Sequence, residues 1–356
     1  MQPSGETGRG GDVPAGRRGR AALMARTVAR RTLTLGVFGV VAWAAGRRGA
    51  GDPVGSGPSA DAATAVPRVG HRAGAPDGLG PAEGGPEPRP RTQLPRGGRI
   101  LFPRYRLVGF SGSPGSPALG RLGIGDLDAR AVEMERLATR YAAGRVGLPV
   151  FELITVIVQA APGRDGLFRV RERPEVIDAH LAAARRHRGL LLLNVQPGRA
   201  AFLDEVRALD RWLVEPDVGL ALDPEWAVGP GQVPGRVFGH TTGAVLDEVA
   251  RHVSGIVREH DLPEKALVVH QLAPRELRGL GALRPHPGVV PVKSVDGLGV
   301  PAAKVATWRR LMADLPWVMR PGFKLFYEED VAAGGPLMTP DEVLALQPTP
   351  EYVLYE

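Results

Sequence analysis

Eight short apolar runs alternate with stretches of helical periodicity from residue 105 to the end of the sequence. The runs are residues 106–110, 151–158, 190–195, 218–222, 266–270, 289–294, 323–327 and 352–355. Strands that alternate with helices imply parallel strands joined by right-handed crossovers. Eight such units in about 250 residues predict one closed, TIM-type (β/α)8 barrel over residues 99–356.

Helical patterns fill nearly every gap between these runs. Leu127, Met134 and Tyr141 recur at spacings that share one helix face. Thr339 to Glu342 form a capping box with proline at the first helical position, so a helix is expected to begin there. The weakest predicted helix is 277–283, which glycines interrupt.

An open, doubly wound sheet is the alternative fold. Such sheets usually carry a glycine-rich phosphate turn after the first strand, and no GxGxxG stands there. Pro291 conflicts with a closed barrel, because it removes a ladder hydrogen bond where no edge strand exists. We therefore expect the sixth strand either to begin near Val292 or to carry a bulge.

The first 98 residues divide into an export segment and a linker. Arginines precede an apolar run of 13 residues, 33–45, in which Ala42-Trp43-Ala44 offers a cleavage site. A membrane span takes about 20 residues, so this run suits a signal peptide. Arg30-Arg31-Thr32-Leu33 resembles a twin-arginine export signal, Met24 is a possible start, and an uncleaved anchor is the alternative.

Residues 46–98 contain 13 Gly and 9 Pro and few large apolar residues, which predicts a disordered linker. The expected organisation is thus residues 1–45 as signal peptide or anchor, 46–98 as linker and 99–356 as barrel. The barrel would be secreted or membrane-anchored outside the cytoplasm, touching membrane only through the N-terminal segment.

Charge and cysteine content exclude several classes of function for the barrel. Residues 1–98 hold 14 Arg and 7 acidic residues, which leaves 31 basic and 31 acidic residues in 99–356. A nucleic-acid-binding domain would carry a basic excess of its own, so no nucleic-acid partner is expected. The absence of cysteine excludes disulfides, thiolate nucleophiles and cysteine-zinc sites.

Polar residues stand where the predicted strands end, and barrel sites are built there. Gly219, Ala221 and Asp223 share one face of their strand, so Asp223 should point into the barrel. Asn194 and Gln196 share a face by the same alternation. Lys324, Phe326 and Glu328 also share one. Lys293 and Lys324 lie inside apolar strands, and each is expected to have a carboxylate partner.

Carboxyl groups after the fourth and seventh strands suggest acid/base chemistry. At the level of the fold, the chain resembles the barrel glycoside hydrolases, which place carboxylates at these two ends, although it reads Asp223-Pro224-Glu225-Trp226 where Asn-Glu-Pro is common. The resemblance implies Asp223 or Glu225 as acid/base and Glu328 as nucleophile or stabiliser. The expected substrate contacts are Asn194, Gln196, Trp226, His270, Asp296, Lys324 and Tyr327.

The resulting hypothesis is an exported hydrolase of glycosidic bonds in a cell-envelope or environmental polysaccharide. Trp226, Phe238, Tyr327 and Tyr355 would be platforms for sugar rings. The partner is then a carbohydrate or another small polar substrate, with no cofactor or resident metal, and the protein a monomer.

Other functions remain open. A non-catalytic carbohydrate-binding barrel of the cell surface would use the same groove. A metal-dependent hydrolase would need His270 with Asp223, Glu225 or Asp296, and no HxH or HExxH spacing is present. A Schiff-base reading of Lys293 is weakened by alternation, which places it opposite Ser294 and Asp296.

Overall fold

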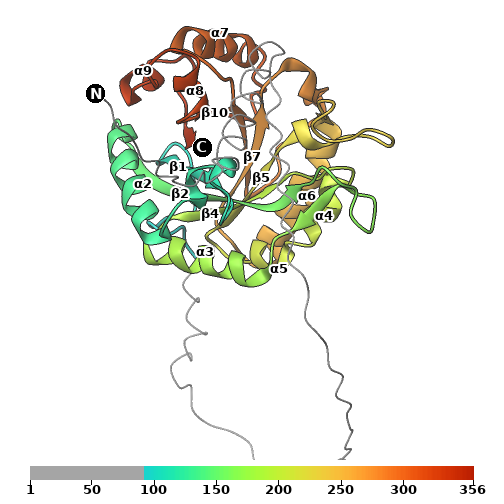
Figure 1. Ribbon diagram of the computed structural model, residues 1–356. Helices are drawn as coiled ribbons and strands as arrows, with labels where there is room; N and C mark the ends of the chain where they lie inside the picture. The colour runs from blue at the N-terminus through green and yellow to red at the C-terminus, as the bar shows by residue number, and fades with distance from the viewer. Residues whose placement is uncertain (1–91) are drawn as a thin grey trace, which may run out of the picture. The chain divides into compact units, whose positions relative to one another are not determined.

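The computed structural model describes residues 92–356, which form an eight-stranded parallel barrel with flanking helices (Figure 1). The sheet order is β1-β11-β10-β9-β7-β5-β4-β2, and pairing of β1 with β2 closes it. The barrel strands are β1 (Tyr105–Gly112), β2 (Val146–Val158), β4 (Leu190–Val195), β5 (Val218–Leu222), β7 (Lys265–Gln271), β9 (Val289–Val295), β10 (Arg320–Leu325) and β11 (Tyr352–Tyr355). The predicted TIM-type barrel is confirmed, and the open sheet is excluded by this closure.

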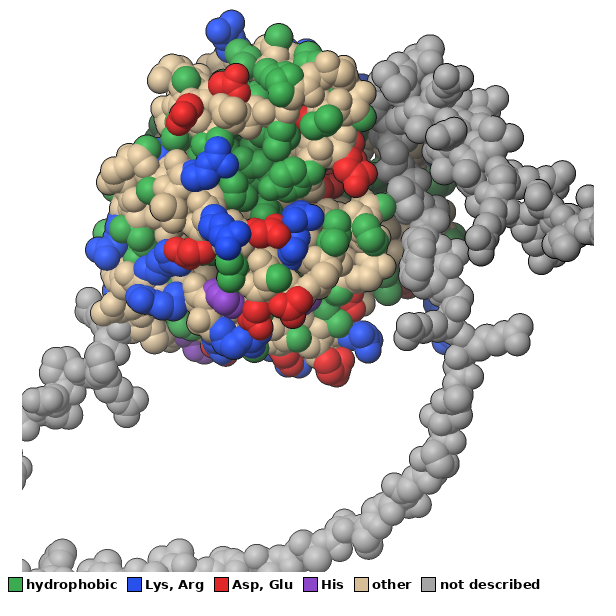
Figure 2. All heavy atoms as spheres, turned by 60° about the vertical axis from the view of Figure 1, so that its left-hand side comes forward, with side chains coloured by type: hydrophobic (Ala, Val, Ile, Leu, Met, Phe, Trp, Pro, Cys, Tyr) green, Lys and Arg blue, Asp and Glu red, His purple; other side chains and the backbone are tan. Residues whose placement is uncertain are grey.

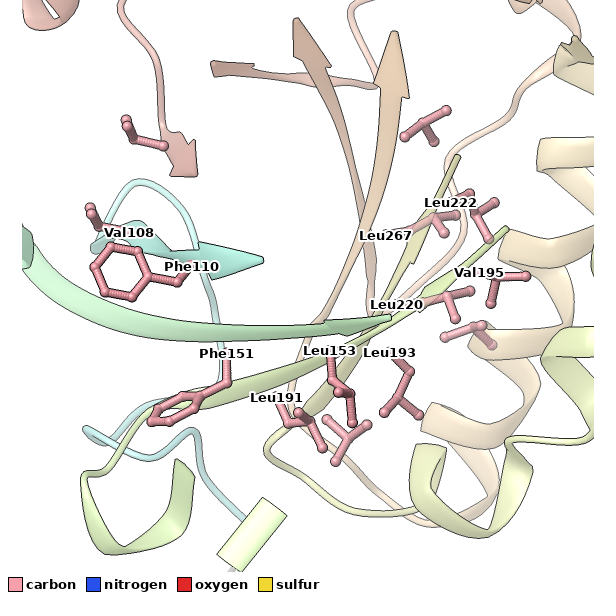
Figure 3. Packing of buried hydrophobic residues seen from close by; sticks show 14 of the residues in the cluster. Val108, Phe110, Phe151, Leu153, Leu191, Leu193, Val195, Leu220, Leu222 and Leu267 are labelled. Carbon is pink, nitrogen blue, oxygen red and sulfur yellow. The ribbon is translucent and has the colours of Figure 1, made fainter. Parts of the chain in front are cut away.

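Alternation along the strands separates two hydrophobic clusters. Val218, Leu220 and Leu222 belong to the larger cluster, between the strands and the helices, whereas Ala221 belongs to the smaller one inside the barrel. Figure 3 shows Leu220 and Leu222 of β5 beside Leu193 and Val195 of β4, among the side chains of the larger cluster. Because alternate residues point to opposite faces, the inner parity continues directly into the polar residues at the strand ends.

Helices cover the outside of the barrel in most of the connections. They are α2 (Leu127–Tyr141), α3 (Pro174–Arg186), α4 (Phe202–Arg207), α5 (Asp210–Leu213), α6 (Gly243–Glu259), α7 (Pro301–Met312), α8 (Glu329–Ala332) and α9 (Pro340–Leu344). Thr339 caps α9 with the predicted capping box. Figure 2 shows positive and negative side chains intermingled on one face. Ion pairs between helices include that of Arg186 in α3 with Asp128 in α2.

The predicted helix over 277–283 is wrong. The connection from β7 to β9 consists of 3-10 turns η4 (Pro274–Glu276) and η5 (Leu280–Ala282) with the short strand β8 (Leu277–Arg278) between them. Strand β8 pairs with β6 (Thr241–Thr242) of the preceding connection. Gly279 adopts a φ of 58°, in the left-handed region, and this conformation interrupts any continuous helix.

Pro291 is accommodated without a bulge. Strand β9 pairs in unbroken register with β7 from Val289 onward, while its pairing with β10 begins only at Val292. Pro291 therefore stands before the β10 ladder starts, where a missing amide costs no inter-strand bond. We expected either a strand that begins near Val292 or a bulge. The strand instead begins at Val289, three residues earlier, and it needs no bulge.

The segment before β1 closes the end of the barrel that lies opposite the C-terminal ends of the strands. Leu94, Leu101 and Phe102 are buried in the inner cluster beside Tyr105 at the start of β1. Arg99 bonds the backbone and side chain of Asp261. This plug fills the base with apolar side chains, so polar groups inside the barrel gather at the other end.

Lys293 differs from the expectation that it would pair with a carboxylate. Its ammonium donates to the carbonyl oxygen of Leu311 in α7, at 2.5 Å, on the helix side of the barrel. Alternation places it there, opposite Ser294, and the carbonyl group takes the part that we assigned to a carboxylate. Lys293 therefore does not point into the barrel interior, where Schiff-base chemistry would require it.

The predicted signal segment and almost all of the predicted linker lie outside the described residues. Within residues 92–356, none of the helices combines the length and hydropathy that a membrane crossing requires.

Gly109 of β1 provides a test of how tightly the strands meet. A Cβ there would lie 1.8 Å from the carbonyl oxygen of Val150, which is fixed backbone. We expect Gly109→Ala to lower the free energy of unfolding by about 3 kcal/mol or more, the upper end for overpacking. Gly255 in α6 has open space around its Cβ position, so Gly255→Ala should instead stabilise by about 0.5–1 kcal/mol. Urea unfolding of both variants checks this, and equal effects would contradict it.

Candidate active site

Glu152 lies at the centre of a buried polar network at the C-terminal end of the barrel. Its Oε1 accepts from His270 Nε2 at 3.0 Å and from Asn194 Nδ2 at 3.2 Å. Its Oε2 accepts from the Tyr352 hydroxyl at 2.5 Å. Burial alone would raise the pKa of Glu152, but His270 and Lys324 lower it, so the group is ionised.

His270 joins this carboxylate to Asp296. Its Nδ1 lies 2.8 Å from Asp296 Oδ2, and the Ser294 hydroxyl donates to Asp296 Oδ1 at 2.8 Å. Burial alone would lower the pKa of His270, yet Asp296 and Glu152 raise it well above the ordinary value. The ring is therefore a doubly protonated cation held between two carboxylates.

Lys324 supplies the second positive charge. Its ammonium lies 3.5 Å from Asp296 Oδ2 and also pairs with Glu356. Burial opposes the charge, but Glu356 and Asp296 raise the pKa of Lys324 well above its ordinary value. The predicted carboxylate partner of Lys324 is thereby confirmed.

Asp223 and Glu225 follow β5, two residues apart. Asp223 accepts from Asn194 Nδ2 at 3.1 Å and from Gln196 Nε2 at 3.1 Å. Glu225 lies in the 3-10 turn η3 (Pro224–Trp226), and its Oε2 atom is enclosed without a hydrogen-bond partner among the described residues. Burial, followed by the Asp223 carboxyl, raises the pKa of Glu225 well above its ordinary value, which favours the protonated form of this group.

Glu276, from the turn after β7, is a further enclosed carboxyl at this end. Its Oε2 accepts from the backbone amides of Leu272 and Ala273, at 2.7 and 3.0 Å. Burial raises the pKa of Glu276 to about 7, and Asp296 contributes to that rise. Glu276 in turn raises the pKa of Glu225, which indicates that the two carboxyls are close.

Six of the residues predicted to form the site lie together in this network. They are Asn194, Gln196, Asp223, His270, Asp296 and Lys324. Their side chains are almost fully enclosed, with at most 7 % of each residue exposed. The network is therefore shielded from bulk water, which strengthens the electrostatic interactions inside it.

Three other predicted residues lie apart from the network. Glu328 is exposed at the N-cap of α8, since β10 ends at Leu325, two residues before the predicted strand end, and alternation does not extend to it. Tyr327 packs in the helix-side cluster, stacked on Tyr355 with ring centroids 5.1 Å apart. Trp226 is half-buried at the end of η3.

The prediction that Tyr355 is a platform for a sugar ring is wrong. Tyr355 is 2 % exposed and faces the helices, where its hydroxyl bonds Tyr141 at 2.7 Å. A ring so enclosed cannot stack on a substrate. Phe238 is half-buried, and the Arg275 guanidinium lies over its ring at 4.0 Å.

Sequence reasoning missed Glu152 and Tyr352. Both have a signal in the sequence: Glu152 is the one charged residue in the predicted strand 151–158, and Tyr352 shares inner parity with Leu354. Neither stands at the C-terminal end of a strand, where the other candidates lie: Glu152 is in the middle of β2 and Tyr352 is the first residue of β11. A charged residue inside an apolar strand needs a buried partner, which is a sufficient signal.

Metal binding is not favoured by the geometry of the described residues. Among residues 92–356, no group of three or more His, Asp or Glu side chains is arranged to hold an ion. Both ring nitrogens of His270 are engaged by carboxylates. A histidine that is held as a cation has no free lone pair for a metal.

The outer surface of the barrel has a groove that lies away from the buried network. It has a volume of about 390 Å³ and runs between α7 and α9, lined by Val305, Trp308, Met338 and Leu346 among others. Its lining is mainly apolar, and it contains none of the residues of the network. We therefore place the candidate site at the barrel end, where titratable groups with shifted pKa values gather.

Comparison with known protein families and with curated proteins found no match to this chain.

The raised pKa of His270 predicts a pH-dependent stability. Because the folded pKa exceeds the unfolded value, the stabilisation is fully present below about pH 6.5 and is lost as pH rises through the folded pKa. At pH 6, His270→Gln should lower the free energy of unfolding by about 3–5 kcal/mol, because it leaves Glu152 and Asp296 without their shared cation. Urea unfolding at pH 6 to 10 should show this deficit shrinking; a constant deficit would contradict the ionised state.

Proposed function

We propose that the protein is a hydrolase of glycosidic bonds, in which Glu225 donates a proton to the leaving oxygen and Asp223 acts as the ionised partner. The observation that carries the proposal is the Asp-x-Glu pair after β5. Glycoside hydrolysis requires one protonated and one ionised carboxyl beside the bond. Glu225 has an enclosed oxygen without a partner and a raised pKa, which suits a general acid at neutral pH.

The ionised partner comes from the same strand end. Asp223 is held by the amides of Asn194 and Gln196, which fix the orientation of its carboxyl. Burial raises the pKa of Asp223, but His270 and Lys324 oppose that rise, and Glu225 is shifted further. When two coupled carboxyls share one proton, it resides on the group with the higher pKa, here Glu225. Glu328 is not retained as nucleophile, because it is exposed at the start of α8.

The cellular setting is part of the same proposal. Export by the N-terminal segment would bring the barrel to a cell-envelope or environmental polysaccharide, and carbohydrate would be its partner. The arginine-preceded apolar run 33–45 and the Gly/Pro-rich stretch after it support this setting.

The test is an assay of the purified protein against a panel of polysaccharides and aryl glycosides of different sugars. We expect turnover of at least one sugar class, with a rate that falls at high pH as Glu225 loses its proton. Proton NMR of the first product would give the anomeric outcome. Absence of turnover across the panel would overturn the proposal.

A second candidate is a carbohydrate-binding barrel without catalysis. It is favoured by the enclosure of the network, since Glu152 and His270 are both 0 % exposed. Saturable binding of an oligosaccharide by wild-type protein, without any hydrolysis of it, would select this candidate.

A further inference from the structure

At the barrel end, the side-chain donors of Asn194, Ser294 and Tyr352 are all engaged, whereas several acceptor oxygens have no hydrogen-bond partner among the described residues. The two amide protons of Asn194 go to Glu152 and Asp223, and the Ser294 hydroxyl goes to Asp296. The Tyr352 hydroxyl also donates to Glu152. Each of these donors serves a carboxylate of the network, and none of them is left to bind an acceptor of a ligand.

Acceptor oxygens remain on the side of the barrel formed by the neighbouring strands β4, β5 and β7. Asn194 Oδ1 and Glu276 Oε1 are buried without hydrogen-bond partners among residues 92–356, as is Glu225 Oε2. Asn194 and Glu276 are 2 % and 0 % exposed. The amide of Asn194 cannot be reversed, because its nitrogen faces two carboxylates, so its free atom is an acceptor.

Carboxyl groups also outnumber cations at this end of the barrel. His270 and Lys324 are the cations that contact the network, and they are already engaged by Glu152, Asp296 and Glu356. Asp223, Glu225 and Glu276 are additional carboxyls. Burial and the neighbouring carboxyls raise the pKa values of all three, that of Glu225 most strongly, because the nearby cations do not balance them. A ligand that brings a positive charge and hydrogen-bond donors would complement this side.

We propose that the site takes sugars that carry a free, protonated amine, with the ammonium bound by Glu276 and the Asn194 carbonyl oxygen. The inference rests on the proposed function for the sugar part of the ligand. An ammonium group has three donors and no acceptor, which matches the unused oxygens. An N-acetylated sugar presents neither the charge nor the three donors, and a neutral sugar lacks the charge.

The experiment measures binding by calorimetry with the full chain. The probes are hexamers of glucosamine and of galactosamine, their fully N-acetylated forms, and cellohexaose as the neutral control. We expect at least one amine hexamer to bind tenfold or more tightly than its acetylated form, and more weakly at high salt. Equal or tighter binding of the acetylated or neutral hexamers, or no binding by either amine hexamer, would overturn the inference.

Two variants locate the amine. Glu276→Gln keeps an oxygen for the amides of Leu272 and Ala273 but removes the charge, so the preference for the amine form should fall to about one. Glu248→Gln, an exposed residue of α6, should retain the preference. A preference unaltered in Glu276→Gln would contradict the assignment, and the wild-type comparison decides the inference even if that variant does not fold.

The outcomes separate this inference from the proposed function. Tight binding of an amine hexamer that is never cleaved would retain the inference and remove the hydrolase. Cleavage of neutral or acetylated sugars alone would retain the hydrolase and remove the inference.

Discussion

Glu225→Gln is expected to lower turnover of an unactivated polysaccharide by about 10²–10⁴-fold, the usual contribution of a positioned general acid. Glutamine fills the same space, but it cannot give up a proton to the leaving oxygen. Burial and the neighbouring carboxyls of Asp223 and Glu276 hold the pKa of Glu225 well above its ordinary value, so the wild-type group keeps its proton to a higher pH than an ordinary glutamic acid. The kcat of the two proteins on the same substrate measures the difference.

The leaving group gives this prediction its specificity. Dinitrophenolate is a good leaving group that departs as the anion, without protonation. The Glu225→Gln variant should therefore hydrolyse a dinitrophenyl glycoside at most of the wild-type rate. The high-pH decline in the wild-type rate should also disappear. Glu248→Gln on the exposed face of α6 serves as the control and should behave as wild type. An equal loss on activated and unactivated substrates would show that Glu225 contributes something other than a proton.

Sequence reasoning reached the barrel and most of its polar end because both depend on local periodicity. Strand parity predicted that Asp223 points into the barrel and that Asn194 and Gln196 share a face, and the network joins these three residues. Parity requires a continuous strand, however, and it failed at Glu328 because β10 ends at Leu325. The pattern of residues along the chain does not specify where a strand stops when aromatic residues continue past it.

The partners within the network were harder to predict, since they depend on how strands meet across the barrel. Glu152 bonds residues from β4, β7 and β11, which are 42 to 200 positions away along the chain. Such contacts follow from closure and stagger of the barrel, which periodicity does not encode. The same holds for Glu276, which approaches the site from a connection that we predicted to be a helix.

A large loss of stability is also expected when Asp330 of α8 is replaced. Its carboxylate lies 2.9 Å from the Lys304 ammonium, and both residues are 1 % exposed. It also accepts from the backbone amides of Gly299 and Phe326, each at 3.0 Å. Asp330→Ala would leave a buried cation and two buried amides without this acceptor, so we expect a loss of about 3–5 kcal/mol in the free energy of unfolding. Urea unfolding measures it.

Two further variants separate the charge from the loss of packing. Lys304→Met combined with Asp330→Ala removes both charges and should recover part of the loss, because the uncompensated charge is gone. Asp204→Ala breaks an ion pair with Arg207 at 4.0 Å that is mostly exposed, and it should stay close to wild type. Lys304 also donates to the carbonyl oxygens of Gly297 and Lys324, beside two residues of the network. Asp330→Ala should therefore also weaken ligand binding at the barrel end, and unaltered binding in a folded variant would show that the network is held independently of α8.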